Sequence, residues 1–412
     1  MRRSRTQAAA AAGVLAAAGL TALAATATPA TAAAGPLGRY IVVLDEGADA
    51  GAVSAEHARD LGVDPGHVYS SALDGYAARM PSTVADKLAD DPRVKYVQAD
   101  RAVSTFAQTT PTGINRANAD ASPTAKINGV DERVNVDVAV IDTGVDLDHP
   151  DLNVNRTKAK NCAVALSADD DHGHGTHVAG TIGAIDNGTG VVGMAPGARI
   201  WPVKVLNAAG VGFTSDIVCG IDYVTANAAS IEVANMSLGG GGEDDGNCGQ
   251  TIGDAEHEAI CASVAAGVTY VVAAGNDSED AANSTPAAYD EVITVSALAD
   301  FNGLPGGGAP STCRSDVDDT FANFSNYGAD VDLIAPGVCI LSTWMAGGYN
   351  TISGTSMASP HVAGGAALYK ATNPSATPAQ VKSALQSRGS LDWNDVDDPD
   401  PTKERLLDAT TL

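Results

Sequence analysis

Three short segments contain residues whose types and flanks could do nucleophilic chemistry. Asp142 ends an apolar run, His174 lies between two glycines in the segment 171–180, and Ser356 lies in the small-residue segment 354–364. An aspartate that closes an apolar strand needs a hydrogen-bonded or cationic partner, because an unpaired buried charge is costly. Ser356 is expected to open a helix, whose dipole and free N–H groups stabilise negative charge beside its hydroxyl.

Asp, His and Ser in this order are the parts of a catalytic triad. His174 would accept the proton of Ser356 as the serine attacks a carbonyl carbon. Asp142 would hold the imidazole in one tautomer and stabilise the imidazolium. Asn276, which follows an apolar strand, could point its amide into a cleft and bind the oxyanion that forms.

Each of these residues also has a simpler interpretation. Asp142 could cap a helix, Ser356 could be an ordinary N-cap, and Asn276 could satisfy a turn. A zinc cluster is a further alternative for three histidines and three aspartates: His172, His174, His177 and Asp169–Asp171. The sequence has no H-E-x-x-H motif, which disfavours zinc. The order and flanks of the residues together favour the triad.

The composition excludes some classes of function. The chain has 412 residues, with 24 Lys and Arg against 50 Asp and Glu, so its net charge is −26. This charge opposes electrostatic binding to nucleic acid or to an anionic membrane. Through Ala107 the net charge is −1, so the remaining −25 lies in the longer second part. A hydrophobic content of 44% allows that part to bury a large core.

The start of the chain is typical of a secretory signal. Three arginines, Arg2, Arg3 and Arg5, precede an uncharged, alanine-rich run over 8–34, and small residues over 30–34 offer A-x-A cleavage sites. A retained membrane anchor is the alternative. The run is mostly weakly apolar Ala and Thr, with Pro29 near its end, so we predict a cleaved signal peptide over 1–34 and a secreted, extracellular protein.

All six cysteines lie in the second, acidic part: Cys162, Cys219, Cys248, Cys261, Cys313 and Cys339. An even number of cysteines in an exported chain predicts three disulfides. Six cysteines allow 15 different pairings, so their number alone leaves the connectivity open.

The region 38–103 is predicted to form a small α+β unit. Its expected elements are a strand over 39–44, a helix over 50–61, a hairpin over 68–80 that turns near Asp74 and Gly75, a helix over 82–90 with Ser82 as N-cap, and a strand over 94–97. This βαββαβ order is the ferredoxin-like arrangement. The polar stretch 104–115 is expected to be an exposed linker.

Beyond residue 135, short apolar runs alternate with helical stretches. The expected strands are 136–141, 200–206, 233–236, 268–274, 292–297 and 333–334, and the expected helices are 175–185, 216–227, 256–266 and 356–370. This alternation predicts an α/β fold, with a mostly parallel sheet that has helices on both faces. Sheets of this kind place their sites at the carboxyl ends of the strands, which is where Asp142 and Asn276 lie.

The chain resembles the subtilisin-like serine proteases, or subtilases, and most closely their proteinase K-like branch. The resemblance rests on Asp142 in Asp-Thr-Gly, His174 in His-Gly-Thr-His-Val-Ala-Gly and Ser356 in Gly-Thr-Ser-Met-Ala-Ser-Pro-His. It implies a secreted serine endopeptidase that works through an acyl-enzyme, without a cofactor for catalysis. It also places Asn276 in the oxyanion hole, together with the backbone N–H of Ser356.

The resemblance also implies the domain organisation. It assigns 35–107 to a propeptide with its linker, which would act as chaperone and intramolecular inhibitor, and 108–412 to the subtilisin-like catalytic domain. Self-processing is expected within 104–110, although the segment 111–114 lacks the tryptophan common in the branch. The expected partners are protein and peptide substrates and the chain's own propeptide. We expect a monomer that binds neither nucleic acid nor, after signal removal, a membrane.

Substrate-binding residues follow from the same resemblance. The walls of the primary specificity pocket would be formed by Ser237, Leu238 and Gly239 and by Ala273, Ala274 and Gly275, with Ser284 near the floor; Gly210, Val211 and Gly212 would form an edge that pairs with extended substrate. These residues are small or uncharged. The expected pocket is roomy and accepts large apolar or aromatic side chains.

The resemblance suggests ions and disulfides as well. Asp332, with backbone carbonyls near Asp290 and Val292, and Asp151 are the candidate ligands of structural Ca²⁺. The implied disulfides are Cys162–Cys219, Cys248–Cys261 and Cys313–Cys339.

Two other functions share these residues. A catalytically inactive binding relative would need a damaged triad, and none of its three residues is replaced. An esterase could use the same triad, but the sequence lacks the G-x-S-x-G elbow of α/β-hydrolases.

Overall fold

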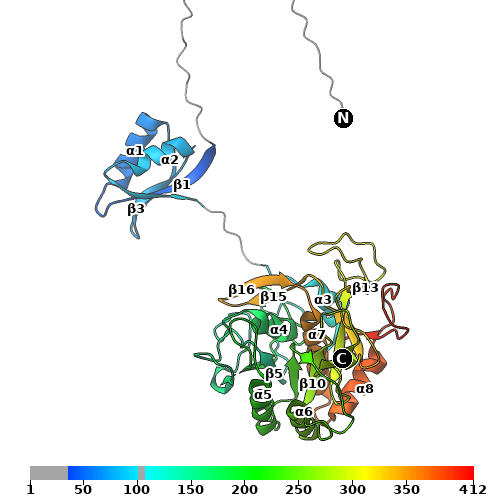
Figure 1. Ribbon diagram of the computed structural model, residues 1–412. Coiled ribbons are helices and arrows are strands. Elements are labelled where there is room, and N and C mark those ends of the chain that lie inside the picture. Colours follow the sequence, from blue (N-terminus) through cyan, green and yellow to red (C-terminus); the bar gives the residue numbers. More distant parts are fainter. Residues whose placement is uncertain (1–35, 101–106) are drawn as a thin grey trace, which may run out of the picture. The chain divides into compact units, whose positions relative to one another are not determined.

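The computed structural model describes residues 36–100 and 107–412, which form two compact units divided between Ser104 and Thr105 (Figure 1). The predicted signal peptide over 1–34 lies outside the described residues, as do residues 104–106 of the stretch 104–110 in which processing is expected.

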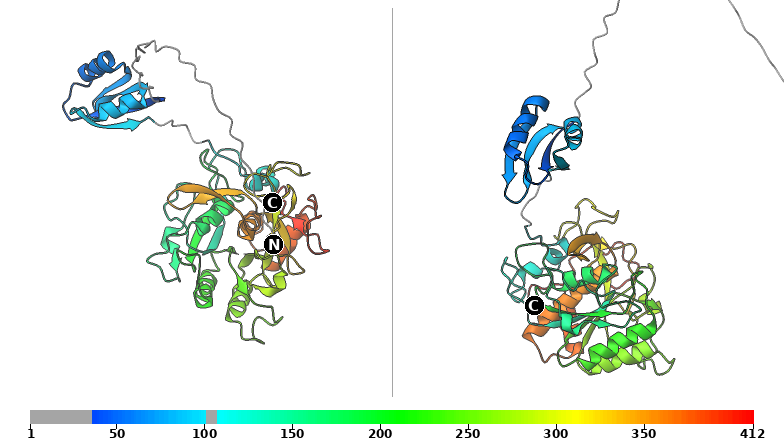
Figure 2. Two further views of the ribbon diagram at one scale, coloured as in Figure 1. Left: turned by 45° about the horizontal axis from the view of Figure 1, so that its top comes forward. Right: turned by 90° about the vertical axis from the view of Figure 1, so that its left-hand side faces the viewer.

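The small unit has the predicted βαββαβ order. Its elements are β1 (Leu37–Leu44), α1 (Ala50–Leu61), β2 (Asp64–Ser70), β3 (Asp74–Pro81), α2 (Ser82–Ala89) and β4 (Val94–Ala99). The strands form one antiparallel sheet in the order β2-β3-β1-β4, as in ferredoxin-like folds. Figure 2 shows this sheet with its two helices, in blue and cyan. Val42, Tyr76, Met80 and Leu88 are almost fully buried between the sheet and the helices.

Two details of this unit were wrongly predicted. The hairpin does not turn at Asp74, which begins β3 and pairs with Ser70 across a three-residue loop. The Asp74 carboxylate instead accepts a hydrogen bond from the backbone N–H of Gly47, at 2.8 Å. Ser82 is the first residue of α2 rather than its N-cap. Pro81 holds the N-cap position in an extended conformation, without a side-chain hydrogen bond.

The large unit is built on a sheet with short accessory strands. Its strands are β5 (Asp137–Asp142), β6 (Lys160–Asn161), β7 (Arg199–Lys204), β8 (Val233–Met236), β9 (Gly240–Gly241), β10 (Thr269–Ala273), β11 (Ser284–Thr285), β12 (Ile293–Ala299), β13 (Thr320–Phe321), β14 (Leu333–Pro336), β15 (Ile340–Trp344), β16 (Gly348–Ile352) and β17 (Arg405–Leu406). Its α-helices are α3 (Thr112–Arg116), α4 (His174–Gly183), α5 (Thr214–Ala226), α6 (Ala255–Ala265), α7 (Thr355–Thr372) and α8 (Pro378–Arg388).

The main sheet has the order β17-β14-β12-β10-β8-β5-β7-β6, and all of these neighbours are parallel; β13 adds an antiparallel edge to β12. Every residue of β5 is buried. Val138 and Val140 face a core with α4, α7 and α8, whereas Ala139 and Ile141 face a core with α5 and α6 (Figure 1). Burial on both faces explains why β5 is apolar throughout.

Sequence patterning did not predict α3, α8, the hairpin of β15 and β16, or the two-residue strands of the large unit. Helix α8 begins with a capping box in which Thr377 and Gln380 bond each other's backbone N–H, and Pro378 occupies its first position. Strands β15 and β16 form a hairpin that packs on α4. The four helices that were predicted for this unit correspond to α4, α5, α6 and α7, and their predicted limits lie within two residues of the observed ones.

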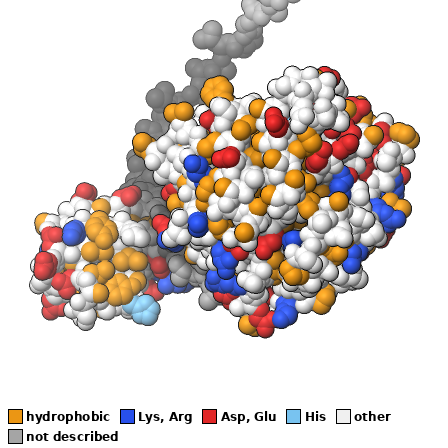
Figure 3. Space-filling model, turned by 90° about the horizontal axis from the view of Figure 1, so that it is seen from below, with side chains coloured by type: hydrophobic (Ala, Val, Ile, Leu, Met, Phe, Trp, Pro, Cys, Tyr) orange, Lys and Arg blue, Asp and Glu red, His pale blue; other side chains and the backbone are white. Residues whose placement is uncertain are grey.

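The surface agrees with the acidic composition. On the face that Figure 3 shows, basic side chains lie in small groups among acidic ones, so this face offers no broad basic surface for nucleic acid. Among the described residues, no helix is both long and apolar enough to cross a bilayer.

Candidate active site

The three predicted catalytic residues come from the start or end of three elements. Asp142 is the last residue of β5, which lies between β7 and β8 in the main sheet. Strands β6 and β7 are added on one side of β5, and β8 and the later strands on the other side, so the strand order changes direction at β5. His174 is the first residue of α4, and Ser356 is the second residue of α7. A change of direction of this kind leaves a crevice at the carboxyl ends of the strands.

Buried Asp142 bonds the partly exposed side chain of His174. His174 Nδ1 lies 2.8 Å from Asp142 Oδ1, which also accepts the backbone N–H of Thr143 at 2.6 Å. The Asp142 side chain is fully buried. Burial lowers the pKa of His174, but the charge and hydrogen bond of Asp142, helped by Asp170, outweigh it and raise this pKa above 6.5 overall. Because an ionised carboxylate only accepts, Nδ1 carries the proton and Nε2 is left as the base.

The loop before His174 is fixed by Asp170, a role that the sequence analysis missed. Its carboxylate accepts the Thr143 hydroxyl at 2.9 Å, the backbone N–H of Gly173 at 2.9 Å and that of Thr176 at 3.0 Å. Gly173 has φ +105° and packs so closely on Trp344 that a Cβ would lie 2.3 Å from its ring. These contacts set the start of α4 and with it the direction of His174.

Ser356 is held by an exchange of hydrogen bonds with Ser237. The Ser356 hydroxyl donates to the Ser237 carbonyl at 3.3 Å, and the Ser237 hydroxyl donates to the Ser356 carbonyl at 2.9 Å. Buried Asn235 donates to Ser237 Oγ and accepts the hydroxyl of Ser359, one turn along α7. To donate to His174, the Ser356 hydroxyl must therefore turn away from Ser237.

Asn276 is oriented by the residue before the serine. Its Oδ1 accepts the backbone N–H of Thr355 at 2.8 Å and the Thr355 hydroxyl at 3.1 Å. Only an amide oxygen can accept an N–H, so these bonds fix which end of the side chain is which. Nδ2 remains as a donor beside Ser356, with which Asn276 lines one cavity.

Two adjoining cavities meet at the triad. The first, of about 320 Å³, is lined by predicted pocket residues together with Asn276 and Ser356: Leu238, Gly239, Ala273, Ala274, Gly275 and Ser284. The second, of about 460 Å³, contains His174 and the predicted edge segment Gly210, Val211 and Gly212, along with Ser237. Leu238 and Gly239 line both cavities. The structure thus brings all of the predicted substrate-binding residues together around the triad.

The comparison with known protein families gives the same assignment. Residues 134–398 match the subtilase family, and residues 39–106 match the peptidase inhibitor I9 family. The chain belongs to the subtilase family. It is a subtilisin-like serine proteinase, preceded by an I9 domain of the kind found in subtilase propeptides.

Individual relatives agree with this family. The chain is 39% identical to an extracellular serine proteinase of Thermus sp. (strain Rt41A), over 84% of each protein. It is 38% identical to subtilisin NAT of Bacillus subtilis subsp. natto, over 76% of this chain and 74% of the relative. A cold-adapted subtilisin-like serine proteinase of known structure matches with a TM-score of 0.53 and 34% identity, covering 71% of this chain and 97% of that one. These matches do not test the proteinase K-like branch, which stays a prediction.

The pocket differs from the expected uncharged one. Besides the small predicted residues, Asp277 and Glu279 line the first cavity, and both are exposed. They lie one and three residues after Asn276 in the sequence, so their presence could have been inferred from the strand end that positions the amide. The small residues form apolar walls, and the two carboxylates add negative charge to the lining.

The expected calcium site at Asp332 does not fit an ion, because a lysine holds its oxygens. Lys382 Nζ lies 2.8 Å from Asp332 Oδ2, 3.2 Å from the Asp290 carbonyl and 2.8 Å from the Val292 carbonyl. These are the oxygens that were expected to bind Ca²⁺. The prediction missed this because Lys382 comes from α8, which was not predicted.

Asp151 has surroundings that fit a cation. Its carboxylate is buried, and burial raises its pKa despite hydrogen bonds from Val191, Asn187 and Tyr349. Within residues 36–100 and 107–412, no basic side chain pairs with it. Amide oxygens lie in the same loop region, where Gln108 Oε1 accepts the N–H of Gly188. A buried carboxylate without a basic partner is a ligand that suits a hard cation, and its present bonds come from N–H and O–H donors, among them Asn187 Nδ2 at 2.8 Å.

The disulfides join Cys162 to Cys219, Cys248 to Cys261 and Cys313 to Cys339, which are the three pairs that the resemblance implied.

The zinc alternative fails, because its histidines have different partners. His177 is buried, which lowers its pKa to about 3, and its Nε2 bonds the Ile340 carbonyl, whereas His174 bonds Asp142.

Proposed function

We propose that the protein is a secreted endopeptidase that cleaves peptide bonds with Ser356 as nucleophile, His174 as general base and Asp142 as the residue that orients it. The observation that carries the proposal is the 2.8 Å contact of His174 Nδ1 with buried Asp142, in a cleft that also contains Ser356. It leaves the basic nitrogen of the imidazole available to the cleft.

Acylation follows from this arrangement. Ser356 Oγ forms a bond to the scissile carbonyl carbon while His174 Nε2 takes the hydroxyl proton. The oxyanion receives hydrogen bonds from Asn276 Nδ2 and from the backbone N–H of Ser356, at the positive end of α7. The C–N bond then breaks, and the imidazolium gives its proton to the departing amine.

Deacylation repeats these steps with water. His174 removes a proton from a water molecule, whose oxygen bonds to the acyl carbon, and the tetrahedral intermediate again carries its charge toward Asn276. The ester bond to Ser356 breaks as the serine oxygen recovers the proton from His174. Asp142 stays ionised throughout and stabilises the imidazolium of each step.

The first cavity is the proposed primary specificity pocket. Its depth is lined by Ala273, Ala274 and glycine backbone, which suits a large apolar or aromatic side chain before the scissile bond. Asp277 and Glu279 allow the pocket to accept a second class of substrate residue. This is a long basic side chain, whose stem would contact the apolar walls while its charge pairs with the two carboxylates.

The domain order supports production as a zymogen. We assign 1–34 to the signal peptide, 35–107 to the propeptide and linker, and 108–412 to the enzyme, with the I9 match supporting the second of these. The propeptide is proposed to inhibit its own enzyme until Ser356 cuts the chain within 104–110. The mature enzyme is proposed to be an extracellular monomer that acts on proteins and peptides.

Calcium is proposed at one of the two expected positions. Asp151, with the side-chain oxygen of Gln108, would hold a structural Ca²⁺, which would offset the charge of a buried carboxylate and tie the loop after α4 to the start of the large unit. The ion has no part in the chemical steps.

Expression of the chain and of Ser356→Ala in a protease-deficient host tests the proposal. The unaltered chain should be secreted, hydrolyse casein and have a new N-terminus within 104–110. The variant should remain uncut and inactive. Maturation of the variant would show that another enzyme does the processing, and casein hydrolysis by the variant would contradict the proposed nucleophile.

A further inference from the structure

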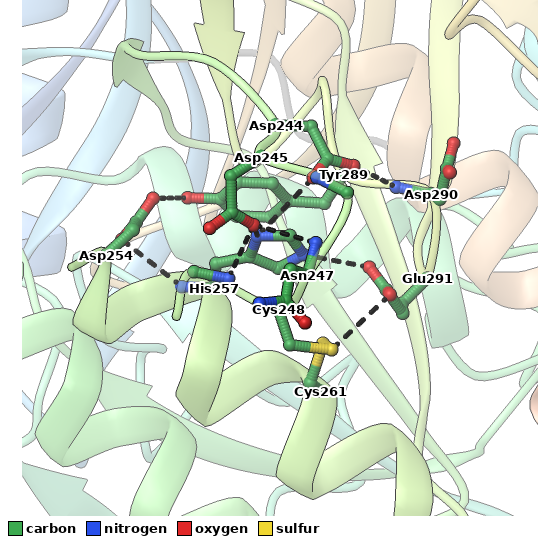
Figure 4. Close-up of polar contacts among 12 residues, drawn as sticks. Asp244, Asp245, Asn247, Cys248, Asp254, His257, Cys261, Tyr289, Asp290 and Glu291 are labelled. Atoms are coloured by element: carbon green, nitrogen blue, oxygen red, sulfur yellow. Dashed lines mark hydrogen bonds and ion pairs between the residues drawn. A yellow bond between two sulfur atoms is a disulfide. The ribbon is translucent and has the colours of Figure 1, made fainter. Parts of the chain in front are cut away.

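A second cluster of titratable side chains surrounds His257, on α6 and away from the triad. The His257 side chain is almost fully buried and its ring stacks on Tyr289, with centroids 3.9 Å apart and planes within 4°. Figure 4 shows the carboxylates of Asp244, Asp245 and Glu291 around this ring. Neither the proposed reaction nor the expected calcium sites use this cluster.

One ring nitrogen of His257 has a clear partner. Nε2 lies 2.9 Å from Glu291 Oε2 (Figure 4). Because an ionised carboxylate only accepts hydrogen bonds, Nε2 carries a proton. In a neutral ring Nδ1 is then the atom with the free lone pair. Histidines that bind metals usually have this arrangement, with the second nitrogen donating to a carboxylate.

The other nitrogen faces two carboxylates without a hydrogen bond. Nδ1 is buried and unpartnered, and it lies 3.6 Å from Asp244 Oδ1 and 3.7 Å from Asp245 Oδ1. Two anionic oxygens repel a lone pair on Nδ1. A positive charge between Nδ1 and the two carboxylate oxygens would therefore stabilise this arrangement. The gaps are longer than an N–H···O hydrogen bond, which spans about 2.7–3.2 Å. Two ligands each about 2.1 Å from a tetrahedral Zn²⁺ stand roughly 3.4 Å apart, close to what is seen.

The loop that brings these carboxylates is held in place independently of any ion. Asp245 accepts backbone N–H groups of residues 247, 249, 251 and 252, and although burial opposes this, they lower its pKa to about 2. Asp244 Oδ2 accepts the N–H of Asp290, and Asp244 Oδ1, the oxygen nearer His257, accepts the N–H of Gly246 at 2.7 Å. The disulfide Cys248–Cys261 ties the loop to α6 and removes both thiols as ligands.

We propose that His257 Nδ1, Asp244 and Asp245 bind a divalent transition-metal ion of the Zn²⁺ class. One imidazole nitrogen with two carboxylate oxygens suits such an ion, whereas Ca²⁺ takes oxygen ligands alone. Gly241, three residues before Asp244, lines the specificity pocket. The ion would anchor the loop that continues from this pocket wall to α6, so its effect is on stability and not on the chemical step.

Calorimetric titration with ZnCl₂ tests the site. Mature enzyme is first inactivated with a serine-directed sulfonyl fluoride to stop autolysis, then freed of metal with a chelator. One Zn²⁺ should bind per chain. His257→Gln and Asp244→Asn should each weaken binding at least about 100-fold, and Glu291→Gln about 10–100-fold. Asp290→Asn, a neighbouring exposed acid whose carboxylate does not face the ring, is the matched control and should change affinity less than about fivefold.

Three binding results would overturn the proposal. These are absence of Zn²⁺ binding by the unaltered enzyme, binding that is unchanged in both His257→Gln and Asp244→Asn, and binding of Ca²⁺ with no Zn²⁺ at these residues. A doubly protonated His257 ring in NMR spectra at neutral pH with Zn²⁺ present would also contradict it, because a proton would then supply the positive charge. Asp244→Asn keeps the test valid if His257→Gln fails to fold.

Discussion

The backbone N–H of Thr355 donates a 2.8 Å hydrogen bond to Oδ1 of Asn276, the residue that we propose binds the oxyanion. This bond turns Nδ2 of Asn276 away from Thr355 and leaves it as a donor. Asn276→Ala should therefore lower kcat by about 10²–10³-fold, the range known for the corresponding donor of subtilisin, with little change in KM. Steady-state kinetics on a chromogenic peptide measures both values.

Asn276→Asp separates this role from a purely structural one. Aspartate keeps an oxygen for the N–H of Thr355 but has no N–H to donate, so its kcat should be at least as low as that of the alanine variant. Activity near that of the unaltered enzyme would mean that Asn276 only holds Thr355 in place.

The pH dependence of activity reports on the pair of Asp142 and His174. His174 must be neutral to act as a base, and its pKa is raised above 6.5 because Asp142 and its hydrogen bond outweigh burial. Activity should therefore be lost as the pH falls through this raised pKa. Asp142→Asn removes the charge that raises the pKa of His174, while burial still lowers it. The acidic limb of the kcat/KM profile should therefore move to lower pH, and kcat should fall about 10⁴-fold. An unmoved limb would show that another group sets it.

The two carboxylates of the pocket lining predict a measurable effect on specificity. Glu279→Gln should lower kcat/KM for substrates with Lys before the scissile bond by about two- to fivefold, since an exposed charge contributes less than about 1 kcal/mol. The same variant should leave substrates with Phe unchanged, and this pair of substrates is the internal control. Equal losses on both would indicate a change in pocket shape.

Lys382 should make the site at Asp332 independent of calcium. Lys382→Met removes the ammonium group that bonds the Asp332 carboxylate and two backbone carbonyls. The loss of these bonds should lower the free energy of unfolding by about 1–3 kcal/mol. It also restores an open set of oxygens, so millimolar Ca²⁺ should raise the Tm of the variant more than that of the unaltered enzyme. Differential scanning calorimetry of the sulfonylated enzymes, with Ca²⁺ and with chelator, gives this difference. Equal calcium responses would show that the lysine does not replace an ion.

Local patterns were enough to predict much of the fold and to single out residues that the structure brings together at the candidate site. The apolar run that ends at Asp142 and the glycines around His174 are constrained by burial and by close approach of backbone. A Cβ on Gly175, for example, would lie 2.1 Å from the Gly144 carbonyl. Residues of this kind leave a signal in the sequence because few other residues fit.

Contacts between distant segments were not predictable in the same way. Asp170 looks like one of several loop aspartates until the fold brings Thr143 and Thr176 against it. Lys382 looks like an exposed helix residue until α8 packs beside the strand end at Asp332. Their roles depend on tertiary position, which the types of neighbouring residues do not encode.

Covalent labelling tests the central claim most directly. The mature enzyme is treated with a serine-directed sulfonyl fluoride, and the site of the adduct is mapped by peptide mass spectrometry while the remaining casein hydrolysis is measured. The account predicts one adduct, on Ser356, with activity falling in proportion to its occupancy, and a much slower reaction in Asp142→Asn. An adduct on another residue, or full activity with Ser356 completely modified, would contradict it.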